Sequence, residues 1–566
     1  MRDKSSGSGW TRRNFLELVG KAGGAAAVYE TMTAMGLINL PEAWAGPPDL
    51  PPGSGAGKSV LILGAGIGGL TLAYELSKAG YHCEILEAQQ RAGGRSLTAR
   101  RGGPVITEES AQHGTTHQEC KFDDGLYLNM GPGRLPYHHR RVLHYCEELQ
   151  VPLEVYVMMT TANRYQTEKG FGGKPQLNRR IANDTQGYVA ELLAKAVRKG
   201  SLDQELGEAD RAQLLSLLAV YGDLGAEKGC APEAYCGSTR SGCADPLTVY
   251  QDCTPAQKLE LGALLKSEFW RHKFYQPLDF EWQPTLFQPV GGMDQIVEGF
   301  KRKVGQLIKY QCEVVDIRLQ ETGVEVTYRN RATGARTTTK ADHCVSNIPL
   351  PVLSGIPSDL SPEYKGAIKL GKFAKTCKVG WQANRRFWET NDEIYGGISY
   401  IDDVITQMWY PSNDYFTKRG TLTGAYNYDA AAEELGAMTL PKRLEAARKG
   451  AIRLHPEFQD DHLVPQSLGL SIAWHNVPYQ LGGWVDWGST EADDQAYARL
   501  LAPDHRFYIV GDQVSTLPGW QEGAMMSAQH VLSQITRVQP KLLGAAAPTA
   551  QRPHAPSSRR LVQGRS

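Results

Sequence analysis

Three glycines at the end of an apolar run point most directly to chemistry. Gly64, Gly66 and Gly69 follow residues 60–63, which are apolar and typical of a strand buried on both faces. The first glycine permits a tight turn, the second lets a pyrophosphate approach the backbone, and the third lets a helix pack on the strand. Glu87 ends a second apolar run 23 positions after Gly64, placed to accept a hydrogen bond from a ribose hydroxyl. Together these features predict a dinucleotide-binding site.

The residues after Glu87 narrow the choice of dinucleotide. They read Arg91-Ala92-Gly93-Gly94-Arg95. An acid followed by R-x-G-G-R resembles the second phosphate-binding element of the flavin amine oxidases, which hold FAD. Gly94 lets the backbone close on the phosphates, and Arg95 can supply charge-assisted hydrogen bonds. The resemblance covers roughly residues 59–538, with the motifs in family order, and it implies FAD as the cofactor.

A second informative run, residues 126–136, indicates a strand followed by a turn that presents Arg134. A guanidinium can hold a carboxylate through two parallel hydrogen bonds. The run resembles the L-amino-acid oxidase branch of the family, in which the matching arginine binds the substrate carboxylate. We therefore predict that Arg134 binds substrate, with a surface position or an FAD contact as the alternatives. Gly131, in the same turn, is predicted to contact FAD.

Two later strands contribute a lysine and a tyrosine. Lys378 lies nine residues before Phe387-Trp388, and this spacing resembles the family lysine that holds a water beside flavin N5. A cation there would assist reoxidation by dioxygen; Lys375 is the alternative in register. Tyr426 resembles the tyrosine that joins the arginine in binding the substrate carboxylate. Tyr428 lies on the same face of the strand and is its alternative.

The remaining predicted site residues also come from the resemblance. Val314 lies in a strand where family members place backbone bonds to the adenine. Gly511 and Asp512 end a strand that resembles the last FAD element, with Asp512 near the ribityl or phosphate region. Trp520 would form a wall of the amino-acid site against the flavin ring. Trp484 stands where covalent family members carry a cysteine, so we predict non-covalent FAD, with Trp484 at the substrate.

The overall composition limits the classes of partner. Lys+Arg and Asp+Glu both number 61 among 566 residues, so we expect no nucleic acid or polyanionic partner. An internal apolar run of about 18 residues is absent from the sequence, which argues against a stable membrane span. His113 and His117 lack a third ligand, and we predict no metal. We expect a homodimer or a higher homo-oligomer.

The N-terminus indicates export rather than fold. Residues 11–16, TRRNFL, resemble a twin-arginine export signal. A weakly apolar stretch follows, and Ala43-Trp44-Ala45 resembles a cleavage site. Twin-arginine export carries folded proteins, which suits an enzyme that loads FAD in the cytoplasm. We therefore predict a periplasmic or secreted protein.

Four cysteines lie in a loop rich in glycine, serine and proline: Cys230, Cys236, Cys243 and Cys253. Their spacing contains no C-x2-C pair and is a poor match for zinc. One or two disulfides after export, or reduced cysteines from folding in the cytoplasm, both agree with the sequence.

The resemblance implies an α/β fold with three parts. These are a doubly wound, Rossmann-like FAD-binding domain assembled from three separated segments, a mixed-sheet substrate-binding domain and a helical domain. We predict a signal peptide over 1–45, a linker over 46–58, FAD-binding segments over 59–125, 291–350 and 491–540, substrate-domain segments over 126–150, 271–290 and 351–490, a helical domain over 151–270 and a disordered tail over 541–566.

The implied reaction is FAD-dependent oxidative deamination of an L-amino acid to a 2-oxo acid. Ammonia and hydrogen peroxide would be released, with dioxygen as acceptor. Most of the dense aromatic residues over 269–287 would pack in the core, with one or two in an apolar substrate pocket that favours a bulky apolar or aromatic side chain. Asp486 could receive a basic side chain, with a solvated turn position as its alternative. A polyamine or monoamine oxidase has no substrate carboxylate to hold, so Arg134 argues against it. A decarboxylating amino-acid monooxygenase remains an alternative that the sequence does not separate.

Overall fold

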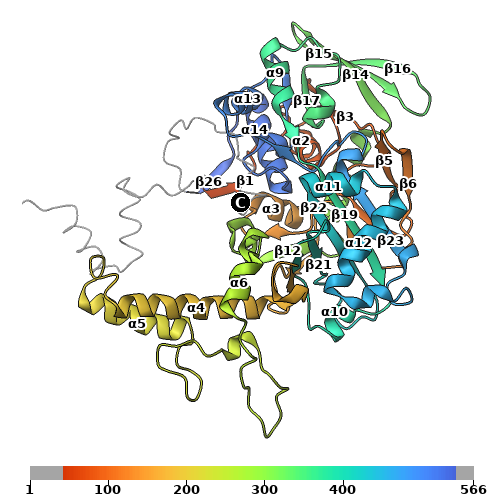
Figure 1. The fold of residues 1–566 in the computed structure, drawn as a ribbon. Helices are drawn as coiled ribbons and strands as arrows, with labels where there is room; N and C mark the ends of the chain where they lie inside the picture. The colour runs from red at the N-terminus through yellow and green to blue at the C-terminus, as the bar shows by residue number, and fades with distance from the viewer. Residues whose placement is uncertain (1–42, 544–566) are drawn as a thin grey trace, which may run out of the picture.

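A five-stranded parallel sheet forms the centre of one domain in the computed structural model, which describes residues 43–543 (Figure 1). Its pairings are all parallel. Its spatial order is β13 (Ile308–Lys309), β3 (His82–Leu86), β2 (Ser59–Leu63), β17 (His343–Ser346) and β25 (Phe507–Ile509). These strands come from three distant stretches of the chain, so the predicted doubly wound domain built from separated segments is confirmed.

The apolar run of β2 explains why this sheet is covered on both faces. Val60 and Ile62 contribute to one hydrophobic core, and Leu61 and Leu63 contribute to another, as the alternation of side chains along a strand requires. The first core also contains residues of α2 (Ile67–Lys78), α3 (Arg140–Glu148), α7 (Gln295–Val304) and α14 (Gln521–Thr536). The second contains residues of α9 (Pro362–Leu370), α13 (Glu491–Leu501) and the antiparallel strands β14 (Cys312–Gln320), β15 (Gly323–Asn330) and β16 (Arg336–Ala341).

A seven-stranded mixed sheet forms the second domain. Its spatial order is β11 (Gln176–Leu177), β10 (Arg164–Gln166), β20 (Ile398–Ile401), β21 (Gln407–Trp409), β22 (Gly420–Tyr428), β19 (Thr376–Ala383) and β23 (Gly469–Ala473). Only β10 and β20 pair in parallel among these strands. Helices α11 (Asp429–Gly436) and α12 (Leu440–Leu454) pack on it. The predicted mixed sheet is therefore confirmed, and two of its adjacent strands, β19 and β22, carry Lys378 and Tyr426.

The helical part is shorter than predicted. Helices α4 (Asn178–Arg198) and α5 (Glu208–Tyr221) extend side by side away from the body, and α6 (Leu261–Ser267) lies where they join it (Figure 1). Residues 151–177, assigned to a helical domain over 151–270, instead form β10, β11 and β9 (Leu153–Tyr156). β9 pairs with β12 (Leu286–Pro289), a distant partner that local periodicity does not reveal. No helix in the described part of the chain is long and apolar enough to cross a membrane.

Helix α3 corrects a second predicted boundary. It lies within residues 126–150, which were predicted as a substrate-domain segment. Its buried residues Val142, Tyr145 and Cys146 belong instead to the core of the FAD-binding domain. The sequence shows an amphipathic helix but does not identify the partner of its apolar face.

Both ends of the described chain are more ordered than predicted. β1 (Ala43–Gly46) pairs with β26 (Lys541–Leu543), so the last residues of the predicted signal peptide and the first of the predicted tail form a ribbon. The predicted linker is not free either, because Gly55 is buried and its N–H donates to the Ala79 carbonyl over 2.9 Å. The twin-arginine motif and the rest of the tail lie outside the described residues.

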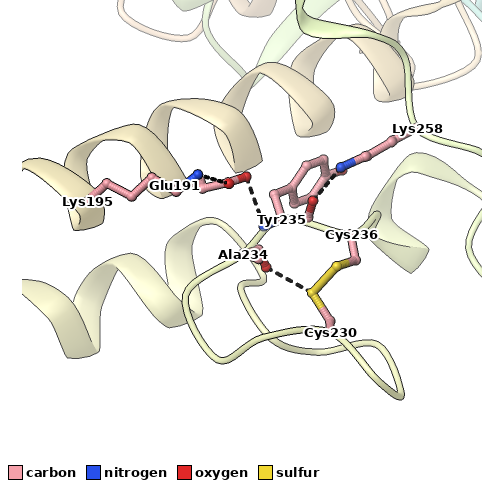
Figure 2. Close-up of a disulfide and its surroundings, with 7 residues drawn as sticks. All are labelled: Glu191, Lys195, Cys230, Ala234, Tyr235, Cys236 and Lys258. Carbon is pink, nitrogen blue, oxygen red and sulfur yellow. Dashed lines mark hydrogen bonds and ion pairs between the residues drawn. A yellow bond between two sulfur atoms is a disulfide. The ribbon is translucent and has the colours of Figure 1, made fainter.

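Two disulfides close the cysteine loop: Cys230–Cys236 and Cys243–Cys253. Figure 2 shows the first beside α4, where Glu191 accepts a hydrogen bond from the backbone N–H of Tyr235 over 3.1 Å. Lys258 Nζ donates to the Tyr235 carbonyl over 2.6 Å. Of the two states that the sequence left open, the structure therefore has the disulfide-bonded one.

Candidate active site

The glycine turn between β2 and α2 leaves no room for side chains. A Cβ on Gly69 would lie 2.3 Å from the Gly64 carbonyl oxygen, and one on Gly66 would lie 2.5 Å from the side-chain amide of Asn347. Gly64 has φ +101°, a conformation that favours glycine. The turn therefore presents bare backbone at the start of α2, where free N–H groups attract a phosphate.

Glu87 stands at the carboxyl end of β3, as predicted. Its Oε2 accepts a hydrogen bond from the Ala65 N–H and its Oε1 accepts one from the Gln89 N–H, both over 2.8 Å. Burial raises its pKa, while these backbone donors oppose that shift. The carboxylate is thus fixed beside the glycine turn by the chain around it.

Two predicted cofactor residues bind each other. Arg95 forms a two-pronged ion pair with Asp512 and also donates to the Gly483 carbonyl. Asp512 further accepts a hydrogen bond from the Gly519 N–H over 2.7 Å. This pair joins the first and third FAD-binding segments. Because Asp512 neutralises it, Arg95 brings less free positive charge to a phosphate than the sequence suggested.

A cavity of about 580 Å³ runs between the two domains. This volume suits a cofactor-sized ligand. Two predicted cofactor residues do not line it: Gly69 is not on its wall, and Arg134 lines the adjoining cavity. The others do: Gly64, Gly66, Glu87, Gly94, Arg95, Gly131, Val314, Gly511 and Asp512. Bare glycine backbone, a fixed carboxylate and apolar strand residues fit the phosphate, ribose and adenine of FAD. At the other end Trp484, Trp520, Tyr426 and Lys378 also line the cavity.

Lys378 is buried where the cavities meet. Its Nζ donates to the carbonyls of Gly131 and Asn129 over 2.5 and 3.2 Å, and it lies 4.5 Å from the centre of the Tyr426 ring. Burial, with a smaller contribution from the Arg134 charge, lowers the pKa of Lys378 to about 7. Lys375, the alternative lysine on the same strand, is only half-buried, and its Nζ pairs with Glu433 over 2.6 Å.

Arg134 is held between aromatic rings. Its Cζ lies 3.8 Å from the centre of the Trp282 ring and 4.7 Å from that of Trp520, with Trp409 at 5.4 Å. The side chain is buried, and its Nε has no hydrogen-bond partner. No carboxylate among residues 43–543 pairs with it. A buried cation without an anion is costly, so this site is prepared for a negatively charged ligand.

The cavity beside Arg134 is smaller, about 80 Å³, and mostly aromatic. Tyr426 and Tyr428 both line it with ring centres 4.8 Å apart, so the structure brings both tyrosine alternatives to the site. Burial raises the pKa of Tyr426 to about 12, so its hydroxyl stays protonated as a donor. The other large side chains on the wall are Trp282, Trp409, Trp484 and Trp520, and no carboxylate of the described chain lines it. Asp486 is exposed and lies outside this wall.

Sequence reasoning missed three residues of the site. Trp282 and Trp409 stack around Arg134, and the aromatic density over 269–287 was the only signal for the first. Asn347 covers the glycine turn. With its amide oriented so that the oxygen faces the turn, that oxygen accepts hydrogen bonds from the backbone N–H groups of Gly66 and Gly69. It follows β17, so its position at a strand end could have suggested a role.

Comparison with known proteins identifies the family. Residues 67–535 match the flavin containing amine oxidoreductases. The chain belongs to this family. Its curated relatives include the flavin-dependent L-tryptophan oxidase RebO of Lentzea aerocolonigenes, 27% identical over 83% of this chain and 96% of that protein. They also include an L-amino-acid oxidase of Vipera ammodytes ammodytes, 23% identical over 85% of this chain and 93% of that protein.

Solved structures show the same family fold. Putrescine oxidase bound to putrescine superposes with a TM-score of 0.52 at 17% identity, covering 85% of this chain and 99% of its own. Cyclohexylamine oxidase from Brevibacterium oxydans IH-35A gives 0.52 at 16% identity with the same coverage. This amine oxidoreductase is thus a flavoprotein with FAD as its cofactor, and the predicted fold class is confirmed.

Proposed function

We propose that this amine oxidoreductase is an L-amino-acid oxidase that converts an L-amino acid and dioxygen to a 2-oxo acid, ammonia and hydrogen peroxide. The observation that carries the proposal is the buried, unpaired guanidinium of Arg134. An amine substrate would leave that charge uncompensated, whereas an amino-acid carboxylate would accept two hydrogen bonds from it. The names of the curated relatives agree with this choice.

The residues of the smaller cavity would orient the substrate. Arg134 and the Tyr426 hydroxyl would bind the carboxylate from one side, and the tryptophans would exclude water. Bound FAD supplies the two-electron acceptor for the hydrogen at Cα. Lys378 would hold a proton or a water at the junction of the cavities, which suits the later reduction of dioxygen.

An aromatic or bulky apolar side chain fits the wall better than a basic one. The aromatic rings offer stacking surfaces, and the absence of a lining carboxylate among the described residues gives a cationic side chain no partner. Lys273 Nζ, 4.0 Å from the centre of the Tyr428 ring, adds a further positive group nearby.

A substrate screen tests the proposal. All twenty L-amino acids would be assayed for peroxide release, with the D-enantiomers and the matching decarboxylated amines as controls. We expect an L-aromatic amino acid to be oxidised best, and its amine poorly. Faster oxidation of amines such as putrescine or cyclohexylamine would instead support an amine oxidase. Aerobic turnover that releases carbon dioxide and an amide in place of hydrogen peroxide would support a decarboxylating monooxygenase.

A further inference from the structure

Tyr428 lines the same small cavity as Tyr426, and the binding of the substrate carboxylate proposed above gives it no role. The two residues stand two positions apart on β22 and therefore share one face of the strand. Their ring centres lie 4.8 Å apart, with 57° between the ring planes. The rings thus lean toward each other, which brings their hydroxyl groups together at the wall of the cavity.

A hydrogen bond joins the two hydroxyl groups and has a direction, with Tyr428 as the donor and Tyr426 as the acceptor. Burial raises the pKa of both residues. The hydrogen bond adds to the rise for Tyr428, which would lose the donated proton, and opposes it for Tyr426, whose oxygen accepts. Both hydroxyl groups therefore stay protonated at neutral pH, and the pair keeps this direction.

The direction of this bond decides where the proton of Tyr426 points. A tyrosine hydroxyl carries a single proton to donate. Because the Tyr426 oxygen already accepts from Tyr428, its own proton is left for another acceptor at the cavity. The backbone of Tyr426 is held as well, since its carbonyl accepts a hydrogen bond from Thr406 Oγ1 over 2.7 Å. Without the Tyr428 hydroxyl, the Tyr426 hydroxyl would be free to rotate about its C–O bond.

A cation from a distant segment holds the Tyr428 ring. Lys273 lies between η3 (Phe269–Arg271) and η4 (Gln276–Leu278), and its Nζ is 4.0 Å from the centre of that ring. Burial lowers the pKa of Lys273 to about 8, while the charge of Asp429 opposes this shift. The ammonium is therefore mostly charged at neutral pH, and a cation over an aromatic face is attracted to it. This contact keeps the ring where its hydroxyl reaches Tyr426.

We propose that Tyr428 is a positioning residue for the substrate carboxylate. It holds the proton of Tyr426 toward the carboxylate and does not bind the carboxylate itself. The inference rests on the proposed function, in which Arg134 and Tyr426 bind that group. A donor whose direction is set before the ligand arrives loses less rotational freedom on binding, so the same hydrogen bond contributes more to affinity.

The test measures how hydrocinnamate, which is phenylalanine without its amine, binds to the oxidised holoenzyme and shifts the flavin spectrum. Tyr426→Phe removes the direct donor, so we expect Kd to rise about 20-fold. Tyr428→Phe keeps the ring beside Lys273 but removes its hydroxyl, and Kd should rise about fivefold. If Tyr428 acts only through Tyr426, the double variant should stay near 20-fold, whereas independent contacts would multiply to about 100-fold.

Tyr364→Phe is the matched control. Tyr364 is fully buried, has Arg499 Cζ 4.6 Å from its ring centre and carries a hydroxyl without a partner, yet it lines neither cavity of the site. Its replacement should leave Kd unchanged. Turnover separates positioning from a general structural role. Tyr428→Phe should raise KM for the best L-amino acid, while kcat and the oxidation of the matching amine stay within about twofold of the wild type.

Three results would overturn the positioning role: an unchanged Kd in Tyr428→Phe, losses that multiply in the double variant, or an equal loss of amine oxidation. The binding measurement needs no turnover, so it remains decisive if peroxide assays show that amines are better substrates than amino acids. That result would count against the proposed function alone.

Discussion

Two buried arginines in this molecule have opposite surroundings. Arg443 is 3% exposed and Arg134 is 8% exposed. Arg443, on α12, donates from both terminal nitrogens to the two oxygens of Glu108, each over 2.9 Å, and from one of them to Ser471. Arg134 has the rings of Trp282, Trp409 and Trp520 around its guanidinium, and no acid among residues 43–543 pairs with it.

The charge state follows these surroundings. Burial is the largest influence on both guanidinium groups and lowers the pKa of each, but for Arg443 the hydrogen bond to Glu108 and the charges of Cys377 and Glu108 together outweigh burial and raise the pKa. For Arg134 burial dominates and the pKa is lowered. The comparison indicates that a neutralised buried arginine joins parts of the fold, whereas an uncompensated one marks where an external anion binds.

Removing Arg443 from its ion pair with Glu108 should have the largest effect on stability. Arg443→Met leaves Glu108 buried without its cation, so we expect the free energy of unfolding to fall by about 3–5 kcal/mol. Arg134→Met removes a charge that lacks a partner, so we expect no loss or a small gain. Urea unfolding of both holoenzyme variants measures the difference. The double variant Glu108→Leu/Arg443→Met should recover most of the stability, and equal losses in the two single variants would refute the comparison.

Replacing Arg134 should instead weaken substrate binding. For Arg134→Met we expect kcat/KM for the best L-amino acid to fall about 100-fold or more, mostly through KM, because a charge-assisted carboxylate contact is lost. Oxidation of the matching amine should change little. Steady-state peroxide assays and the flavin spectrum measure both properties.

Arg134→Lys sharpens this result as its matched control. It keeps the charge but lacks the planar fork, so its kcat/KM should lie between those of the wild type and Arg134→Met. Loss of the yellow cofactor from either variant would show that Arg134 belongs to the FAD site instead.

The sequence predicted those parts of the site that depend on local spacing. The glycine turn, Glu87 after β3 and the turn that presents Arg134 follow from residues close together in the chain. The two-residue period also placed Tyr426 and Tyr428 on one face of β22. The structure adds that Lys378, and not Lys375, is the one buried at the cavity.

Features formed by distant segments were not predicted. Trp282 and Trp409 reach Arg134 from η5 (Phe280–Trp282) and β21, and Glu108 meets Arg443 across 335 positions of the chain. Each of these residue types also occurs at ordinary core or surface positions, so the residue type alone does not indicate a role at the site. The domain boundaries near 150 and 541 failed for the same reason, because β9 and β26 depend on remote partners.

Lys378 offers an intermediate case, a buried cation that can lose its charge. Its pKa is lowered from 10.5 to about 7, so the folded state releases this proton at lower pH than the unfolded state. The cost of burying the charge is therefore complete below pH 7 and is relieved as the pH rises from 7 toward 10.5. We expect Lys378→Met to be more stable than the wild type by about 1–2 kcal/mol at pH 6, with the difference shrinking at pH 9.

Lys375→Met is the control for that pH dependence. Lys375 lies three positions earlier in the chain, is half-buried and pairs with the exposed Glu433, so its replacement should change stability by less than about 1 kcal/mol at both pH values. Urea unfolding at pH 6 and pH 9 measures both variants. A pH-independent effect of Lys378→Met would mean that its ammonium keeps its proton throughout this range.

The smallest effect on activity is expected in the cysteine loop. Replacing Cys230, Cys236, Cys243 and Cys253 by serine opens two short loops, but Tyr235 stays anchored because its hydroxyl donates to Asp184 over 2.5 Å. None of these cysteines lines a cavity described above, so kcat/KM and FAD content should stay at the wild-type values. Limited proteolysis should nevertheless cut the serine variant first between residues 230 and 253, because short closed loops restrict local opening. A fall in kcat/KM without a change in proteolysis would show that this loop acts on the Arg134 cavity. The helical part would then contribute to substrate binding, and the distinction between the structural role of Arg443 and the binding role of Arg134 would not extend to it.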